Sequence, residues 1–445
     1  MSSDIRTPIY QEKIGISIKE VYSFTPIARD AFSSVLVGNA LYFFGGQPYT
    51  ISNETFYLDV SQSFNSENPP WIETPSAAIP FGSIFATVSS TIVNNNPSIY
   101  LFGGFMFDPV SLIDSFISFV YTFDPQTFKW DIPQTKGQIP TRRRDIEAVN
   151  DSSGKIYIFG GSNDFARPFT YFNDMIIFDT NILTWSYGTT FNAPKSLFAY
   201  TATLLSNGVI VYIGGIDLNL RTANINEINL YDTKLDSWKV MIAKNINTVE
   251  SRYSHTAVLA PNDQIIICGG AGVFERVLVA PNIAVLTTQS TSFEWTIPQI
   301  SSNIEEIPTL ARHKATLVEN YMIVAFGIIT QIDKASTKGG NSKLYLLDIR
   351  NYTWINKFEH LEQKPKPNPT KSQIPSNSPN SYNSPNSSKD LTTTKIVISV
   401  ISSIVGTTFL IGIGMLLYRL YKKGKEKQTL RISGNLGSEY NGNYN

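Results

Sequence analysis

Six copies of a short apolar run that ends in glycine recur along the chain, and this repeat limits the possible folds more than any other feature. The copies occupy residues 41–46, 99–104, 156–161, 210–215, 265–270 and 323–327. Their first glycines fall at 45, 103, 160, 214, 269 and 327, and the sixth copy lacks a second glycine. The spacings of 58, 57, 54, 55 and 58 residues predict one repeated structural unit.

Two further marks recur in phase with the glycines. The six tryptophans, each 24 to 27 residues after its first glycine, are Trp71, Trp130, Trp185, Trp238, Trp295 and Trp354. In four repeats an apolar or aromatic residue and Asp precede the Trp by six residues, at 123–124, 178–179, 231–232 and 347–348. Repeat 1 is stretched by an insertion after Asp59, and repeat 5 has Thr287 in place of the Asp.

Turn residues within each repeat predict four antiparallel strands. In repeat 1, strands 32–37 and 40–44 flank a Gly-Asn pair, and in repeat 4 strands 201–205 and 209–213 flank an Asn-Gly pair, both hairpin signals. A third strand such as 175–178 leads through an Asp-opened turn to a fourth strand that carries the Trp. Small sheets of this kind must stack on one another to bury both faces. The chain is therefore predicted to be an all-β, six-bladed β-propeller.

As a set, the repeat-start Arg, the Gly pair, the apolar-Asp pair and the Trp resemble kelch repeats. Over residues 25–360 the chain is similar to the kelch/galactose-oxidase-like propeller family. The departures are Ile328 in place of a glycine, the missing Asp in repeat 5, and the absence of a starting Arg in repeats 2 and 4. Before the first repeat, residues 1–24 alternate from Ile14 to Phe24 and offer a possible ring-closing strand.

Composition excludes several classes of function. Charged residues make up 16% of the chain, with 36 Lys+Arg balanced by 36 Asp+Glu, so a nucleic-acid partner is not expected. One cysteine, Cys268, excludes an internal disulfide framework and any multi-cysteine metal site.

The C-terminal part has a different character. Residues 361–394 are rich in Pro, Ser and Asn and predict an extended stalk, and residues 396–418 hold no charge and predict one transmembrane helix within 395–419. Arg419, Lys422, Lys423, Lys425 and Lys427 follow, so the tail at 420–445 is expected in the cytoplasm and the propeller outside. No signal peptide is visible. Either the true start lies upstream of Met1, or the chain is tail-anchored with a cytosolic propeller.

The resemblance raises the question of an oxidase, because galactose oxidase shares this fold. That family's copper site combines a cross-linked Tyr–Cys pair, a second Tyr and two histidines, whereas this chain has only His255, His313 and His360. Cys268 stands where a packing residue belongs. No nucleophile–base pair, paired carboxylates or phosphate-binding loop is apparent, so neither catalysis nor a metal or cofactor is expected. A galactose-oxidase-like surface enzyme remains the alternative.

A protein or glycan partner is predicted to bind on one face of the propeller. The connections between strands 2 and 3 are long and differ in every repeat, whereas the 1–2 turns are tight. In some kelch propellers the starting arginines grip a partner, and the bland alternative is a bond to neighbouring backbone. The candidate residues are Arg29, Tyr49, Phe105, Phe107, Arg144, Phe165, Arg167, Arg221, Arg252, Phe274, Arg276 and Arg312. A cytosol-facing scaffold is the second alternative function.

Four Asn residues fit the acceptor pattern for N-glycosylation. They are Asn53, Asn150, Asn351 and Asn386, and an Asn- and Ser-rich chain also produces such triplets by chance.

Overall fold

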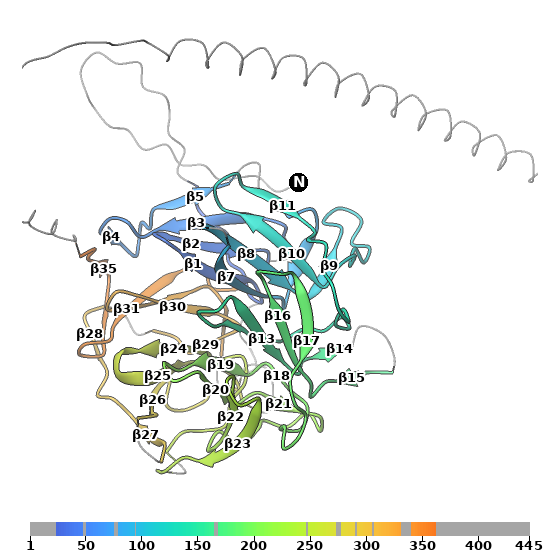
Figure 1. Cartoon of the computed structure of the whole chain (residues 1–445). Helices are drawn as coiled ribbons and strands as arrows, with labels where there is room; N and C mark the ends of the chain where they lie inside the picture. The colour runs from blue at the N-terminus through green and yellow to red at the C-terminus, as the bar shows by residue number, and fades with distance from the viewer. Residues whose placement is uncertain are drawn as a thin grey trace, which may run out of the picture. The chain divides into compact units, whose positions relative to one another are not determined.

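The computed structural model describes residues 24–361 apart from 48–49, 75–78, 94, 164–167, 246–247, 273–276, 290–291, 305–306 and 331–339. Six antiparallel sheets are arranged in a ring, so the predicted six-bladed β-propeller is confirmed (Figure 1). The only helix among these residues is a single 3-10 turn, η1 (Pro261–Asp263).

Each blade is built from strands that follow one another in the chain. Blade 1 contains β1 (Ser33–Val37), β2 (Ala40–Phe44), β3 (Thr55–Asp59) and β5 (Trp71–Glu73). Blade 2 contains β7 (Thr87–Val93), β8 (Asn96–Phe102), β10 (Val120–Asp124) and β11 (Lys129–Asp131), and blade 3 contains β12 (Ala148–Asn150), β13 (Lys155–Phe159), β16 (Met175–Asp179) and β17 (Thr184–Tyr187). The strand bounds expected in repeats 1, 3 and 4 are correct to within one residue.

The second half of the ring repeats the pattern. Blade 4 contains β19 (Thr201–Leu204), β20 (Val209–Ile213), β22 (Glu227–Asp232) and β23 (Ser237–Ile242), and blade 5 contains β24 (Thr256–Ala260), β25 (Gln264–Cys268), β26 (Ile283–Thr287) and β27 (Glu294–Thr296). Blade 6 contains β30 (Lys314–Val318), β31 (Tyr321–Ala325), β33 (Leu344–Asp348) and β34 (Thr353–Ile355), and β28 (Ser301–Ser302) adds a fifth, parallel strand.

A closed circle of backbone hydrogen bonds joins the six blades at the centre. Just before its first strand, every blade has one residue with a left-handed backbone, whose N–H donates to the carbonyl of the equivalent residue in the preceding blade at 2.8–3.2 Å. The blade 1 residue donates to the blade 6 residue, which completes the circle. The six residues, with φ between 52° and 56°, are Ala31, Phe85, Asp145, Ala199, Ser254 and Arg312. These positions define the true register of the repeats.

The tryptophans pack between blades. Trp185 lies 4.3 Å from Phe178 of its own blade and 6.0 Å from Phe102 of blade 2, measured between ring centroids. Trp238 lies 4.7 Å from Phe159 of blade 3 in the same way. The aromatic residue before a glycine pair therefore packs on the Trp of the next blade. Six hydrophobic clusters fill the six blade interfaces.

The register corrects the sequence assignment in repeat 6. Gly327 donates its N–H to the Arg29 carbonyl, as Gly46 donates to Ser83, and its φ of 90° matches the second glycine of the other pairs. The missing glycine is therefore the first one, and Phe326 occupies that position with a φ of 59°. The left-handed backbone of Phe326 is offset by packing, because its buried ring stacks on Trp71 with the ring centroids 5.6 Å apart. Ala325, at the position where blades 1 to 3 have an aromatic residue, has no ring to make this contact.

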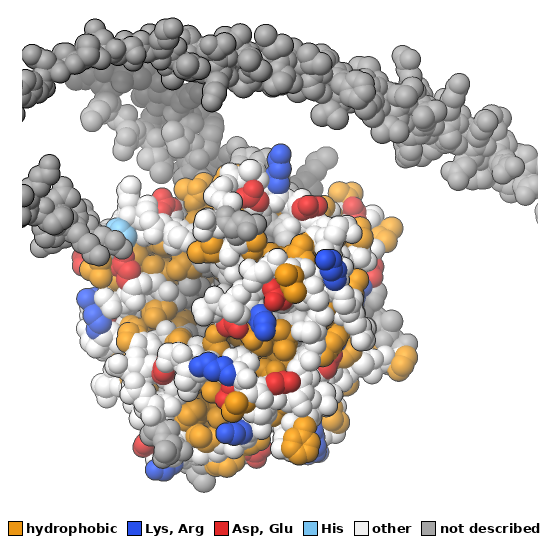
Figure 2. Space-filling model, viewed as in Figure 1, with side chains coloured by type: hydrophobic (Ala, Val, Ile, Leu, Met, Phe, Trp, Pro, Cys, Tyr) orange, Lys and Arg blue, Asp and Glu red, His pale blue; other side chains and the backbone are white. Residues whose placement is uncertain are grey.

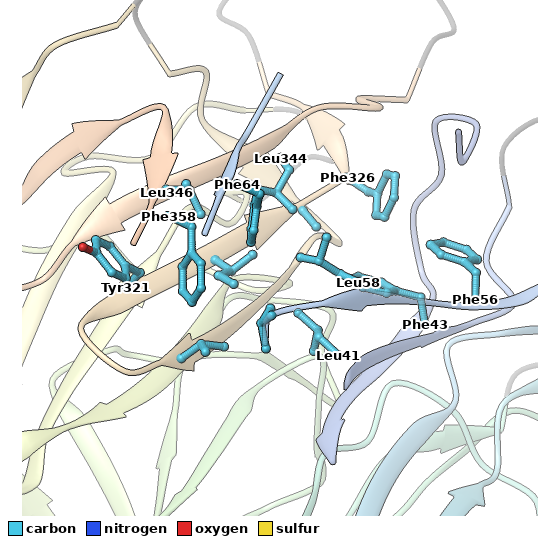
Figure 3. Packing of buried hydrophobic residues seen from close by; sticks show 14 of the residues in the cluster. Leu41, Phe43, Phe56, Leu58, Phe64, Tyr321, Phe326, Leu344, Leu346 and Phe358 are labelled. Atoms are coloured by element: carbon cyan, nitrogen blue, oxygen red, sulfur yellow. The ribbon is translucent and has the colours of Figure 1, made fainter. Parts of the chain in front are cut away.

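Blades 6 and 1 meet at the seam of the ring, where the chain enters and leaves. Phe43, Phe56 and Phe326 pack together there with aliphatic residues of both blades (Figure 3). At the edge of this core, β35 (Lys357–Phe358) pairs with β4 (Phe64–Asn65), which lies in the insertion of repeat 1, and the buried Phe358 ring stacks on Phe64. A strand from the end of the described chain thus pairs with the first repeat. The N-terminal strand proposed for ring closure lies outside the described residues, apart from Phe24, which contacts Phe56.

The predicted stalk, transmembrane helix and basic tail also lie outside the described residues. Among the residues that the structure does describe, no helix has the length and hydrophobicity needed to span a bilayer.

Replacing Trp185 by Ala should destabilise the propeller by about 3–5 kcal/mol, because the ring is buried between two blades and its removal leaves a cavity. The midpoint of urea unfolding measures the loss. Trp185→Phe is the control, since it keeps an aromatic ring and should lose much less. An unchanged midpoint in Trp185→Ala would remove the inter-blade role assigned to this residue.

Candidate functional site

The propeller has two unlike faces. The loop face carries the 2–3 loops and the ends of the 4–1 connections, and the tight-turn face carries the 1–2 and 3–4 turns. Between β1 and β2 two residues suffice, whereas seventeen residues, 103–119, separate β8 from β10. Variable loops on a rigid scaffold are common sites of binding, so the loop face is the first candidate.

Short pairings on the loop face fix each repeat-start segment against the residues that follow the glycine pair. They are β6 (Gly82–Ile84) with β9 (Phe105–Phe107), β18 (Leu197–Phe198) with β21 (Ile216–Asp217), β29 (Leu310–Ala311) with β32 (Ile328–Ile329), and the single bridges Asp30–Gln47, Arg144–Ser162 and Tyr253–Ala271. In blade 3, β14 (Ser162–Asn163) also pairs with β15 (Thr170–Tyr171). All six blades use the same register, and the start of every 2–3 loop is therefore rigid.

Buried arginines fasten both ends of these loops in blades 1, 3 and 5. Arg29, Arg143 and Arg252 each donate to the carbonyl of the first glycine in their repeat, at 2.9–3.0 Å. The same guanidinium groups reach the returning end of the loop: Arg29 contacts Glu54, Arg143 contacts Asp174 at 2.5 Å, and Arg252 donates to the Ala280 and Pro281 carbonyls. Ser83, Leu197 and Leu310 take this position in the other blades.

Arg29 and Arg252 are therefore structural residues, and their burial keeps them from a partner. Burial lowers the pKa of Arg252 to about 10. Burial also lowers the pKa of Arg29, and the nearby Glu54 carboxylate offsets part of that lowering. Arg252 therefore remains charged at neutral pH. Spacing along the sequence predicted Arg144 as the equivalent arginine of repeat 3. In the structure, Arg143, one residue earlier, occupies that position.

Arg144 and Arg312 do reach the mouth of the central channel. Both guanidinium groups lie 5.1 Å from the ring centroid of Phe85, and that of Arg144 lies 5.2 Å from Phe105. Arg144 pairs with Asp145, and Arg312 lies 3.7 Å from Asp30. The mouth thus carries charges of both signs over aromatic rings.

The channel itself is narrow. On opposite sides of the channel, the Lys314 Nζ and Glu147 Oε2 atoms lie 3.8 Å apart. The cavity beneath the circle of backbone hydrogen bonds has a volume of about 60 Å³, which suits a few water molecules and is far below the size of a small-molecule site. Recognition at this face must therefore involve the rim.

The remaining candidates differ in their placement. Phe105 and Phe107 are partly buried in β9, with Phe105 packed beside Arg142 and Arg144, and Arg221 is exposed in the blade 4 loop. Tyr49, Phe165, Arg167, Phe274 and Arg276 lie outside the described residues.

Among the described residues of the 2–3 loops, the most exposed apolar side chains were missed by the search for aromatic residues and arginines. In the blade 2 loop, the exposed fractions of Val110, Ile113 and Ile117 are 91%, 66% and 77%. Leu112 of the same loop and Leu218 and Leu220 of the blade 4 loop are exposed as well. The sequence does contain a sign of this patch, because several aliphatic residues occur within a long loop that is otherwise polar. In the structure, Asp108 at the start of this stretch accepts hydrogen bonds from the Val110 and Ser111 N–H groups.

Two of the three histidines, His255 and His313, and the cysteine occupy buried structural positions. His255 and His313 are buried, and each ring Nε2 lies within hydrogen-bond distance of a threonine of the preceding blade, Thr201 at 3.1 Å and Thr256 at 2.8 Å. Burial lowers the pKa of His313 to about 3 and raises that of Cys268 to about 12. In the described part of the chain, no group of three or more His, Cys, Asp or Glu residues is arranged to hold a metal.

The possible glycosylation sites differ in access. Asn351 is exposed in the turn between β33 and β34, and Asn150 is exposed but accepts a hydrogen bond from Ser89 at 3.0 Å. Asn53 is half-buried and donates to the Ile79 carbonyl. Asn386 lies outside the described residues.

Known proteins share this repeat and this ring. The family model for the KLHDC2/KLHL20/DRC7 Kelch-repeats domain matches residues 15–215 and 87–327. Kelch domain-containing protein 3 of Rattus norvegicus is 28% identical over 54% of this chain and 63% of its own length, and host cell factor homolog hcf-1 of Caenorhabditis elegans is 26% identical over 52% and 31%. The chain thus aligns with less than two thirds of these relatives. The solved structure of YjhT matches with a TM-score of 0.53 and 13% identity over 74% of this chain and 98% of its own, which shows the fold alone.

Arg252→Met should destabilise the propeller by about 3–5 kcal/mol, because the buried carbonyl of Gly269 and the partly buried bonds to Ala280 and Pro281 lose their donor. Urea unfolding measures the change. Arg221→Met, on the exposed part of the blade 4 loop, should change stability by less than about 0.5 kcal/mol. Equal effects of the two substitutions would contradict the structural role of Arg252.

Proposed function

The chain belongs to the kelch-repeat family, and from that premise we propose that it is a non-catalytic module that captures a protein partner on its loop face. The observation that carries the proposal is the exposed apolar blade 2 loop on an otherwise rigid ring. Val110, Ile113 and Ile117 hold apolar surface in water, where it costs free energy that a partner would recover.

The rest of the loop face supplies the polar part of recognition. Arg144 and Arg312 lie near the channel mouth. Arg144 pairs with Asp145 and Arg312 with Asp30, and these pairs fix the orientation of both guanidinium groups. Arginine and aromatic residues around an apolar anchor are frequent in binding hot spots. Charged side chains of both signs are scattered over the molecular surface seen in Figure 2, and such a mixed surface suits a protein partner better than a uniformly charged partner.

The proposal extends to the cellular setting. Residues 396–418 carry no charge over 23 positions and are followed by five basic residues within nine, a pattern that supports a membrane anchor with its tail in the cytoplasm. The propeller would then meet an extracellular protein. A glycan ligand is the alternative for the same face, and a glycan array probed with the full chain separates the two.

Replacing Ile113, Ile117 and Leu220 together by Ser should abolish partner capture with little change in melting temperature, because all three side chains are exposed. Cross-linking of the full-length protein in its native cells, followed by quantitative mass spectrometry, measures capture. Leu235→Ser with Val240→Ser is the matched control, since these exposed aliphatic residues of blade 4 lie in a 3–4 turn and an outer strand. If the control loses the same proteins and the loop variant keeps them, the wrong surface has been chosen.

Membrane orientation is tested by proteolysis. In sealed membranes, protease on the cytoplasmic side should remove only the tail that begins near Arg419 and leave the propeller intact. Digestion of the propeller from that side would instead place it in the cytosol, as the tail-anchored alternative requires.

A further inference from the structure

The tight-turn face holds a cavity that its short turns gave no reason to expect. Its volume is about 750 Å³, within the range of ligand sites. The turns of blades 1, 2 and 3 form its walls, with Val37 on the blade 1 side, Ile92 and Gln126 on blade 2, and Asn150 and Ser152 on blade 3. None of these residues belongs to the loop face, so the cavity is independent of the function proposed above.

An overlong hairpin in blade 2 creates the cavity. β7 and β8 have seven residues each, whereas β1, β24 and β30 have five, so the pairs Ile92–Pro97 and Val93–Asn96 project beyond the neighbouring hairpins. Ile92 is 71% exposed at this projection. The turns of blades 1 and 3 do not extend as far, and the space beside the hairpin stays open.

The lining of the cavity is uncharged apart from Asp151. That carboxylate already accepts hydrogen bonds from Ser153, Lys155 and Tyr157, which outweigh its partial burial and lower its pKa. The other polar groups are hydroxyls and amides: Ser90, Thr91, Asn95, Gln126, Asn150, Ser152, Ser153 and Asn181. No Lys or Arg belongs to the lining as described. An anionic ligand would lose hydration there without gaining an opposite charge. A cationic ligand would meet only Asp151, whose two oxygens already accept hydrogen bonds from the protein.

The arrangement favours a peptide over a sugar. Amide and hydroxyl side chains both donate and accept, which matches peptide N–H and C=O groups, and aliphatic and proline side chains provide an apolar wall. The one aromatic ring in the lining, Tyr42, is buried and packed against Phe44, Tyr57 and Phe123, so it offers no open face for stacking.

A strand edge is available to hold such a peptide. β7 is the edge strand of its sheet in the described structure, and its beginning is held to blade 3 by Thr87, which accepts from the Ala148 N–H at 3.0 Å, and by Ser89, which donates to Asn150. In its second half, Ser90, Thr91 and Ile92 line the cavity. An extended segment added to this edge would gain main-chain hydrogen bonds. We propose that this cavity binds an extended, uncharged peptide segment with an aliphatic or proline side chain against Ile92.

A phage-displayed library of random peptides, panned on the full-length protein, tests the proposal. Uncharged sequences with an aliphatic or proline residue should be enriched, and a synthetic copy of one should bind at least tenfold more weakly to the double variant Gln126→Trp, Ser152→Trp in fluorescence anisotropy. Both positions are exposed, so the added rings fill the cavity without disturbing the core. Lys234→Trp is the matched control, since Lys234 takes the place of Gln126 in the blade 4 turn, and it should change binding less than twofold.

The outcomes separate the two faces of the propeller. No enrichment, or equal binding to the filled variant, overturns the proposal. Loss of binding in the Ile113, Ile117 and Leu220 variant but not in the filled one assigns the peptide to the loop face and overturns it as well. Binding to an oligosaccharide array that disappears in the filled variant would show that the cavity takes sugars instead.

Discussion

The closed circle of six backbone hydrogen bonds at the centre of the ring is the constraint on which the other features depend. Each link requires a left-handed residue at the same place in every blade, and Ala31, Asp145 and Arg312 adopt that conformation without being glycine. Once the circle is closed, the strand that follows each link begins at the same level along the axis of the ring. The second glycine of each repeat and the paired starts of the loops then lie at equivalent positions in successive blades, and the buried arginines lie at equivalent positions in blades 1, 3 and 5.

The blade count was predictable because the marks of the repeat report contacts that recur in every unit. The glycine pair marks a backbone that passes close to the next blade: a Cβ on Gly45 would lie 2.3 Å from the Ser83 carbonyl oxygen. The aspartate after the third strand accepts from the backbone two residues on, as between Asp179 and Asn181. Such local rules depend on a few neighbouring residues, so sequence reveals them directly.

Spacing along the chain could not resolve shifts of a single residue. Arg143 and Arg144 lie equally well within the interval between the repeat start and the glycine mark, yet one is buried and the other reaches the channel mouth. Likewise Gly327 looks like a first glycine until its hydrogen bond to Arg29 shows it to be the second. The cavity of the tight-turn face depends on two extra pairs in one hairpin relative to its neighbours. That comparison needs three-dimensional register.

The seam of the ring has a mechanical consequence. Every blade is made of its own consecutive strands, and the chain end is held to blade 1 by β35, which pairs with β4 through Lys357–Asn65 and Phe358–Phe64. The Phe358 ring is buried and stacks on Phe64 at 5.0 Å, within the same cluster in which Phe326 meets Trp71. A pull on Leu361 would therefore load these buried rings together with the two strand pairs, because β35 detaches only if Phe358 leaves the core for water. Tension at the C-terminal end is thus resisted by the same side chains that hold blades 6 and 1 together.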